Sequence, residues 1–119
     1  MNKYRDKSDF DINKAVAASL GCTAEYENES VTVFRNNNGG MPLVVSATAD
    51  SPDNFDPCNN PDDAFPLIID VKLSIHPDFY NDCESWIVRT VHIPPVKDKS
   101  LTRAICIAYL MMKDAENEK

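Results

Sequence analysis

One segment near the C-terminus, residues 101 to about 116, is apolar around most of its circumference. Its apolar residues at helical spacing, which share one face, are Leu101, Ala104, Ile105, Ala108, Met111 and Met112. Ile107 and Leu110 lie off that face, so a helix here must be covered on more than one side. The 119 residues have room for one compact domain, and we expect this helix, capped by Asp98 or Ser100, at its core.

Two further helices are expected, each with its own start signal. Ser8 and Asp11 have the spacing of a capping box, and apolar residues follow at helical spacing until a glycine at position 21. Asn60 and Pro61 provide a cap and a first-turn proline for a second helix to about residue 71. Pro66 lies inside that helix and predicts that it is short or kinked.

Between the helices the apolar period changes to two, which is typical of strands. Residues 31–34, the turn cluster 36–40 and residues 42–48 predict a β-hairpin. Residues 73–75 and 85–93 predict two more strands, the second of which ends at a pair of prolines.

The predicted element order is α-β-β-α-β-β-α. It lacks the strand, helix, strand repetition of a doubly wound fold, and the hairpin favours antiparallel pairing. We therefore expect an α+β single-domain sandwich over residues 1–119, with three helices packed on a mostly antiparallel sheet of about four strands. Residues 1–7 and 113–119 are expected to be frayed ends.

The acidic residues are concentrated in the middle of the chain. The net charge is −7, but residues 25–82 alone hold eleven acidic residues against Arg35 and Lys72, a net of −9. This charge counts against nucleic acid or an anionic membrane as the direct partner. An acidic binding surface, if the protein has one, should lie in this middle segment.

The cysteines favour reduced thiols in a cytoplasm. They have no C-x-x-C spacing, so no zinc site is expected, and they are Cys22, Cys58, Cys83 and Cys106. The first ten residues lack the apolar core of a signal peptide, and the longest apolar run, 105–112, is too short to cross a bilayer. We expect a cytoplasmic protein without metal or cofactor.

Three stretches of the chain together resemble a known family. They are residues 8–17, residues 55–69 (FDPCNNPDDAFPLII), and Arg103-Ala104 leading to residues 110–112. In this order and spacing they look like a family of small phage and prophage proteins, which includes the NinX-like proteins of lambdoid phages and domains described as a phage alpha-beta-alpha sandwich. The resemblance covers roughly residues 8–112, and its middle stretch is the most specific.

The resemblance implies context more than chemistry. The family is phage-borne and has no assigned activity, so no catalytic residue is carried over, and the implied compartment is the cytoplasm of a bacterial host. The family's middle motif usually reads Asp-Ala-Trp-Pro. Here Phe65 stands at the aromatic position before Pro66, which is compatible with packing.

An enzyme is not expected. His76 precedes a proline at a strand end, and His92 is expected on a strand face shared with Trp86, where a structural role is the usual one. Cys58 has no basic residue close in sequence to activate its thiol. Asp62 and Asp63 beside it are accounted for by the positive end of the second helix.

Two function classes remain open. The first is a protein-binding module that docks on a host or phage protein through its acidic middle segment. The alternative interpretation of that acidic segment is that its charge only keeps the protein soluble. The second is a small-molecule binder or enzyme, with a pocket between loop 50–60 and the start of the second helix. The alternative interpretation of residues 55–69 is a structural motif that caps that helix. The candidate binding residues are Asp50, Asp53, Asp56, Asn59, Asp62 and Asp63. Their spacing does not match a calcium loop, and the oligomeric state stays open.

Overall fold

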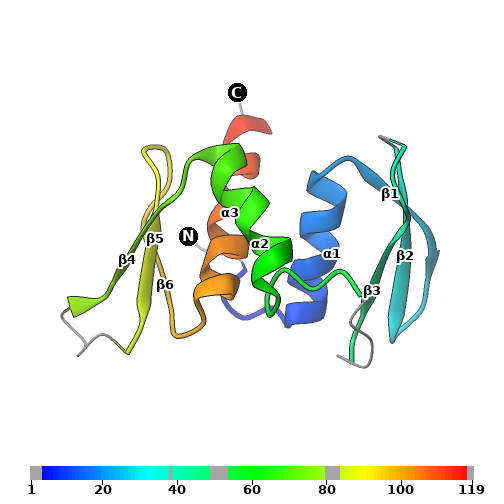
Figure 1. The fold of residues 1–119 in the computed structure, drawn as a ribbon, viewed down its shortest axis with the longest axis horizontal. Helices are drawn as coiled ribbons and strands as arrows, with labels where there is room; N and C mark the ends of the chain where they lie inside the picture. Colours follow the sequence, from blue (N-terminus) through cyan, green and yellow to red (C-terminus); the bar gives the residue numbers. More distant parts are fainter. Residues whose placement is uncertain (1–3, 38, 49–53, 80–83, 118–119) are drawn as a thin grey trace.

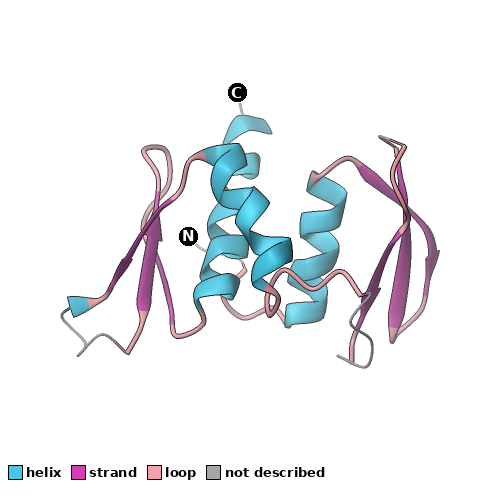
Figure 2. Ribbon diagram, in the orientation of Figure 1, coloured by secondary structure: helices cyan, strands magenta, loops and turns pink. Residues whose placement is uncertain are grey.

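The computed structural model describes residues 4–37, 39–48, 54–79 and 84–117. The elements in this part of the chain are α1 (Asp9–Ser19), β1 (Cys22–Glu27), β2 (Val31–Asn36), β3 (Leu43–Ser46), α2 (Pro61–Val71), β4 (Ser74–Pro77), β5 (Trp86–Arg89), β6 (Val96–Asp98) and α3 (Leu101–Asn117). The molecule measures 42 × 35 × 23 Å. A sheet lies at each end of the longest axis, and the helices form the layer between the sheets (Figures 1 and 2).

The helices begin where the sequence predicts. The Ser8 hydroxyl accepts a hydrogen bond from the Asp11 amide at 3.1 Å, and α1 is followed by Gly21 at φ 91°. Asn60 caps α2 by accepting from the Asp62 amide at 3.0 Å. The helix α2 continues through the exposed Pro66 to Val71, so the proline does not shorten it.

The first sheet is an antiparallel meander of β1, β2 and β3. The predicted hairpin is confirmed as β2 and β3, with Val33 opposite Val44. Strand β1 was not predicted as a strand of its own; it pairs with β2 through an irregular register between Ala24 and Tyr26. Five of its six residues are exposed, so its sequence carries no apolar alternation to mark it as a strand.

The second sheet is an antiparallel meander of β4, β5 and β6. Ile75, Val88 and Val96 lie directly opposite one another and face the helices. Strand β5 ends at Arg89, so the prediction of one strand over 85–93 is wrong beyond that residue. His92 lies in an exposed turn, not on a strand face with Trp86, because the chain reverses here to enter β6.

The α+β class and the antiparallel pairing are confirmed, but the strands are divided differently. The sequence predicted one sheet of about four strands, whereas the described residues form two sheets of three strands on opposite sides of the helices. Three-residue β6 follows the proline pair that the sequence suggested as a terminator. The split could not be read from local patterns because it depends on which distant strands pair.

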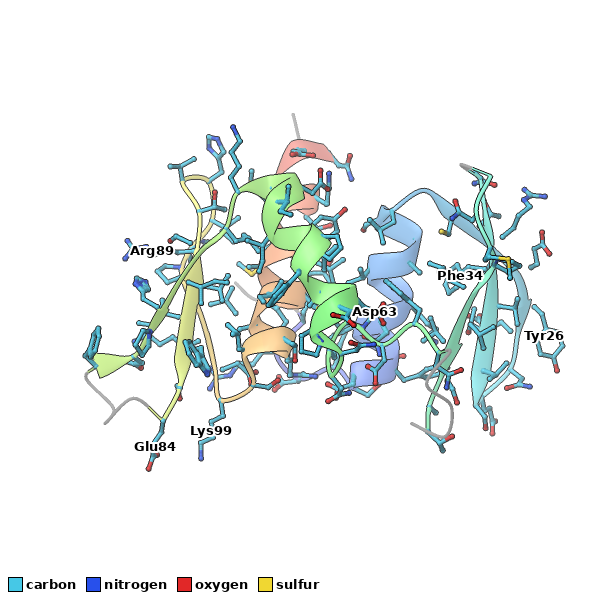
Figure 3. All side chains as sticks on the ribbon, in the orientation of Figure 1. Tyr26, Phe34, Asp63, Glu84, Arg89 and Lys99 are labelled. Carbon is cyan, nitrogen blue, oxygen red and sulfur yellow. The ribbon has the colours of Figure 1, made fainter. Side chains whose placement is uncertain are left out.

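Helix α3 is the centre of the core, as predicted. Its residues from Ala104 to Leu110 are all buried, and it packs against α1, α2, β5 and β6. A second, smaller apolar cluster of Ala17, Phe34 and Val45 joins α1 to the first sheet. In Figure 3 the ring of Phe34 points from β2 toward α1, while Tyr26 lies on the far side of the sheet.

Both described chain ends contact α3 or extend it. Tyr4 is only 7% exposed, and its hydroxyl donates to Asp114 Oδ2 at 2.6 Å. Helix α3 runs to Asn117. The predicted frayed ends fall partly on residues 1–3 and 118–119, which lie outside the described residues.

Candidate functional site

All three helices begin at the same end of the molecule, at the bottom of Figure 1. Side chains from the three helix starts and the loop before α2 form one hydrogen-bonded group, which we call the helix-start cluster. Its members are Asp9, Asn13, Asp56, Cys58, Asn59, Asp63, Thr102 and Arg103. The positive ends of three helix dipoles meet here, so carboxylates are electrostatically favoured at this place.

Asn13 is the buried centre of the helix-start cluster. It is 2% exposed, its Nδ2 donates to Asp56 Oδ1 at 2.7 Å, and its Oδ1 accepts from the Cys58 amide at 3.1 Å. Thr102 Oγ1 donates to the Cys58 carbonyl at 2.5 Å from the side of α3. The loop before α2 is therefore held to both α1 and α3 by bonds that satisfy buried polar groups.

Arg103 is the basic member of the cluster and lies at its more exposed side, beside Asp9. It forms ion pairs with Asp9 and, at 3.4 Å, with Asp98, and Asp9 in turn accepts from Asn59 at 3.2 Å. Its guanidinium also donates to the main-chain carbonyls of Lys7 at 2.6 Å and Arg5 at 3.2 Å. This one side chain ties the N-terminal segment to the start of α3.

The predicted site residues before and in α2 divide into two groups. Asp56 accepts from both Asn13 and Asn59, and Asp63 accepts from the Asp56 amide at 3.0 Å, so these groups bond within the protein. Asp62 is exposed at the first turn of α2, and no basic side chain of the described residues pairs with it. Asp50 and Asp53 lie outside the described residues.

Asn13 and Arg103 were not predicted as site residues and belong only to the stretches that carry the family resemblance. Asn13 falls on the apolar stripe of α1 at helical spacing from Val16 and Ala17, where a polar residue needs buried partners. Arg103 stands in the first turn of α3, where the helix dipole disfavours a positive charge. Both anomalies were readable signals for a carboxylate-rich neighbourhood.

The buried thiols face each other inside the core. Cys58 is 1% exposed and Cys106 is fully buried. A hydrogen bond with Cys58 and burial together raise the pKa of the Cys106 thiol well above its usual value. A raised pKa keeps the group protonated, and a protonated thiol is a poor nucleophile.

The outward face of α2 combines apolar and acidic side chains. Phe65 is 54% exposed and Ile69, one turn later, is 79% exposed. Pro66 lies beside them, and Asp62 precedes them by one turn on the same side. We call these four residues the outer α2 face. The sequence left Phe65 compatible with packing, and in the structure about half of its surface is exposed; Ile69 was not singled out from the sequence.

The acidic residues of the middle segment are spread over the molecule. Glu25 and Glu27 lie on β1 and form ion pairs with Arg35 at 3.5 Å and Lys14 at 4.0 Å. At the far end of α2, Asp70 pairs with Lys113 at 3.4 Å. The described carboxylates of residues 25–82 thus come from β1 and the turn after it, from the loop before α2, from α2 and from the segment after β4.

The described residues contain no cluster of three or more His, Cys, Asp or Glu side chains able to hold a metal ion. His76 lies in β4, and its Nε2 is buried without a hydrogen-bond partner in the described part of the chain. Within the same residues, no helix combines the length and apolar character needed to cross a bilayer.

The chain matches a known protein family over nearly its whole length. A family model described as Bacteriophage P22, NinX matches residues 3–113, nearly the whole chain, including all of the helix-start cluster and α2. This confirms the resemblance found in the sequence. No curated protein and no solved structure matches the chain.

Proposed function

This chain belongs to the bacteriophage P22 NinX family and is a phage accessory protein, and we propose that it acts as a non-enzymatic protein-binding module. The proposed contact is the outer α2 face, and the proposed partner is a host or phage protein. That partner presents an apolar pocket bordered by a lysine or arginine.

The observation that carries the proposal is the exposure of Phe65 and Ile69 on one helix face. Large apolar side chains on adjacent helical turns are costly to leave in water, and contiguous exposed apolar groups commonly mark interaction sites. Asp62 adds an unpaired negative charge at the edge of the same face among the described residues. A basic group on the partner would complement it and orient the helix.

The internal bonding of the helix-start cluster supports a scaffold role for the neighbouring loop. The described polar side chains of Asn13, Asp56 and Asn59 bond to one another, so this loop is better suited to holding α2 in place than to binding a small substrate. The cluster then fixes the orientation in which the outer α2 face is displayed.

A retention experiment on immobilised protein tests the proposal. Lysate of the phage's host, infected and uninfected, is passed over wild-type protein and over the Phe65→Ser/Ile69→Ser double variant. We expect a host or phage protein to be retained by the wild type and lost with the double variant. Retention should also weaken with Asp62→Asn and with added salt, because a charge contact is screened.

Tyr26→Ser is the matched control, because Tyr26 is 57% exposed but lies on the first sheet. It should retain the same protein as the wild type. Equal retention by the wild type and the double variant would reject the outer α2 face as the contact. Retention that only the control loses would move the contact to the first sheet.

A further inference from the structure

The outer side of the second sheet carries a groove of about 410 Å³ that neither the sequence nor the family accounts for. Its polar lining comes from Lys72, Ser74, Arg89 and Thr90, and its apolar lining includes Val91 and Ile93. None of the described residues that line it carries a carboxylate. The volume is in the range of small-molecule sites.

Strand register explains why these groups meet. Ser74 and Arg89 are directly opposite each other in the β4–β5 ladder. Since Ile75 and Val88 face the helices, Ser74 and Arg89 point the other way, and Figure 3 shows Arg89 on the side of the sheet away from the helical layer. Lys72 enters the same groove from the end of α2.

Both cations of the groove stand without a carboxylate partner among the described residues. Elsewhere in that part of the chain, Lys14, Arg35, Lys97, Arg103 and Lys113 each pair with an acid, while Arg5, Lys7 and Lys99 have no such pair and lie outside this groove. In a chain with 19 acidic and 12 basic residues, two neighbouring cations that avoid pairing leave a local positive site on an acidic protein.

The backbone of Lys72 is an independent sign that this side chain matters. It is the one non-glycine residue with positive φ in the described chain, at φ 57° and ψ 57°. Helices commonly end with glycine in this left-handed conformation because a side chain strains it. Strained positions kept by a larger residue are often functional.

We propose that this groove binds a small phosphate monoester. The phosphoryl group lies between the Lys72 ammonium and the Arg89 guanidinium, with the hydroxyls of Ser74 and Thr90 as further donors. The body of the ester lies against Val91 and Ile93. Two unpaired cations match the charge of a phosphate dianion, and the apolar wall distinguishes an ester from free phosphate. The proposal does not depend on the partner of the outer α2 face.

Titrations followed by amide chemical shifts test the groove with three probes: adenosine 5′-monophosphate, adenosine and inorganic phosphate. We expect the monophosphate to bind at least about tenfold more tightly than either of the others and to shift amides around residues 72–74 and 89–93. Lys72→Gly and Arg89→Gln should each weaken it by about tenfold. Lys99→Gln, an exposed lysine outside this groove, should leave binding unchanged.

Lys72→Gly also separates binding from folding. Glycine accepts the left-handed conformation without strain, so this variant should melt no lower than the wild type while it loses the ligand. Equal, weak responses of wild type and both groove variants would mean an adventitious ion only and overturn the proposal. Adenosine binding as tightly as its monophosphate, or shifts confined to another surface, would overturn it as well.

Discussion

The two sheets have the same number of strands and the same topology, but they are attached to the helices in different ways. The second sheet shares the main apolar core with α3, through Val88 and Val96, which are both buried. The first sheet meets α1 through the small cluster of Ala17, Phe34 and Val45. It is also linked to the loop before α2, where the Phe55 amide donates to the Val44 carbonyl at 2.8 Å.

Meanders of the same topology need not have the same stability. A region with few buried apolar contacts opens at a lower free energy than the global core. The first sheet should therefore open locally while the three helices and the second sheet remain folded. Its dependence on α1 makes the helix-start cluster, which fixes α1, part of its support.

The largest effect is expected from Ile105→Ala. Ile105 is fully buried in α3, and removing its side chain leaves a cavity that should cost about 2–5 kcal/mol of global stability. Denaturant unfolding measures the loss, and hydrogen exchange should show both sheets affected. If the second sheet kept its protection after this change, the shared core with α3 would be refuted.

The next effect is expected from Asn13→Ala. It leaves the Cys58 amide and the Asp56 carboxylate without their buried partner, at a cost of about 1–3 kcal/mol. Asn59→Ala, at the exposed edge of the cluster, is the control and should cost less. Urea midpoints for the two variants give the comparison, and equal losses would argue against Asn13 as the centre of the cluster.

Val45→Ala and Val88→Ala form a matched pair that sharpens the contrast between the sheets. Both valines are fully buried, one in each sheet, and each change removes apolar surface worth about 1–2 kcal/mol. Hydrogen exchange should show Val45→Ala raising exchange mainly in β1–β3, and Val88→Ala lowering the global free energy of unfolding. The same pattern from both variants would mean that the sheets open together.

The smallest effect is a pH dependence at the N-terminal segment. Burial, and then the bond to Asp114, raise the pKa of Tyr4 above its ordinary value of 10.0. The folded protein therefore holds the proton more tightly, so this stabilisation is full below pH 10 and declines as pH rises above it. The slope for one such group is at most about 1.4 kcal/mol per pH unit.

Chemical denaturation of the wild type and of Tyr4→Phe between pH 8 and 11 measures the contribution of the Tyr4 proton to stability. The free energy of unfolding should fall less steeply with rising pH in the variant than in the wild type. Part of the decline remains, because burial and a hydrogen bond with Asp70 also raise the pKa of Tyr109. Parallel curves for wild type and variant would show that the Tyr4 proton does not contribute to stability.

The sequence predicts those parts of the molecule whose causes are local. Ser8, Asn60 and Pro61 mark helix starts because a cap acts within one turn, and the hairpin of β2 and β3 follows from a turn between two apolar runs. The division into two sheets could not be predicted, because it depends on which distant strands pair with one another. No local sequence pattern indicates that the helices should lie between the two sheets.

The site was less predictable than the fold. The sequence placed Asp56 in a surface loop and Asp63 at a helix start, but it did not predict their hydrogen bonds, because the partners come from α1 and from the neighbouring loop. The groove with Lys72 and Arg89 depends on a cross-strand neighbour and on one left-handed residue. Such sites emerge only when distant segments are placed together.

The bulge in β1 has a consequence for how the protein behaves in a crowded cell. β1 is an edge strand, and such strands can pair with a second copy and start aggregation. The irregular register between Ala24 and Tyr26, with Glu25 and Glu27 beside it, makes this edge uneven and negatively charged. Another chain would meet a distorted ladder and like charge, so this edge of the first sheet is protected from self-association.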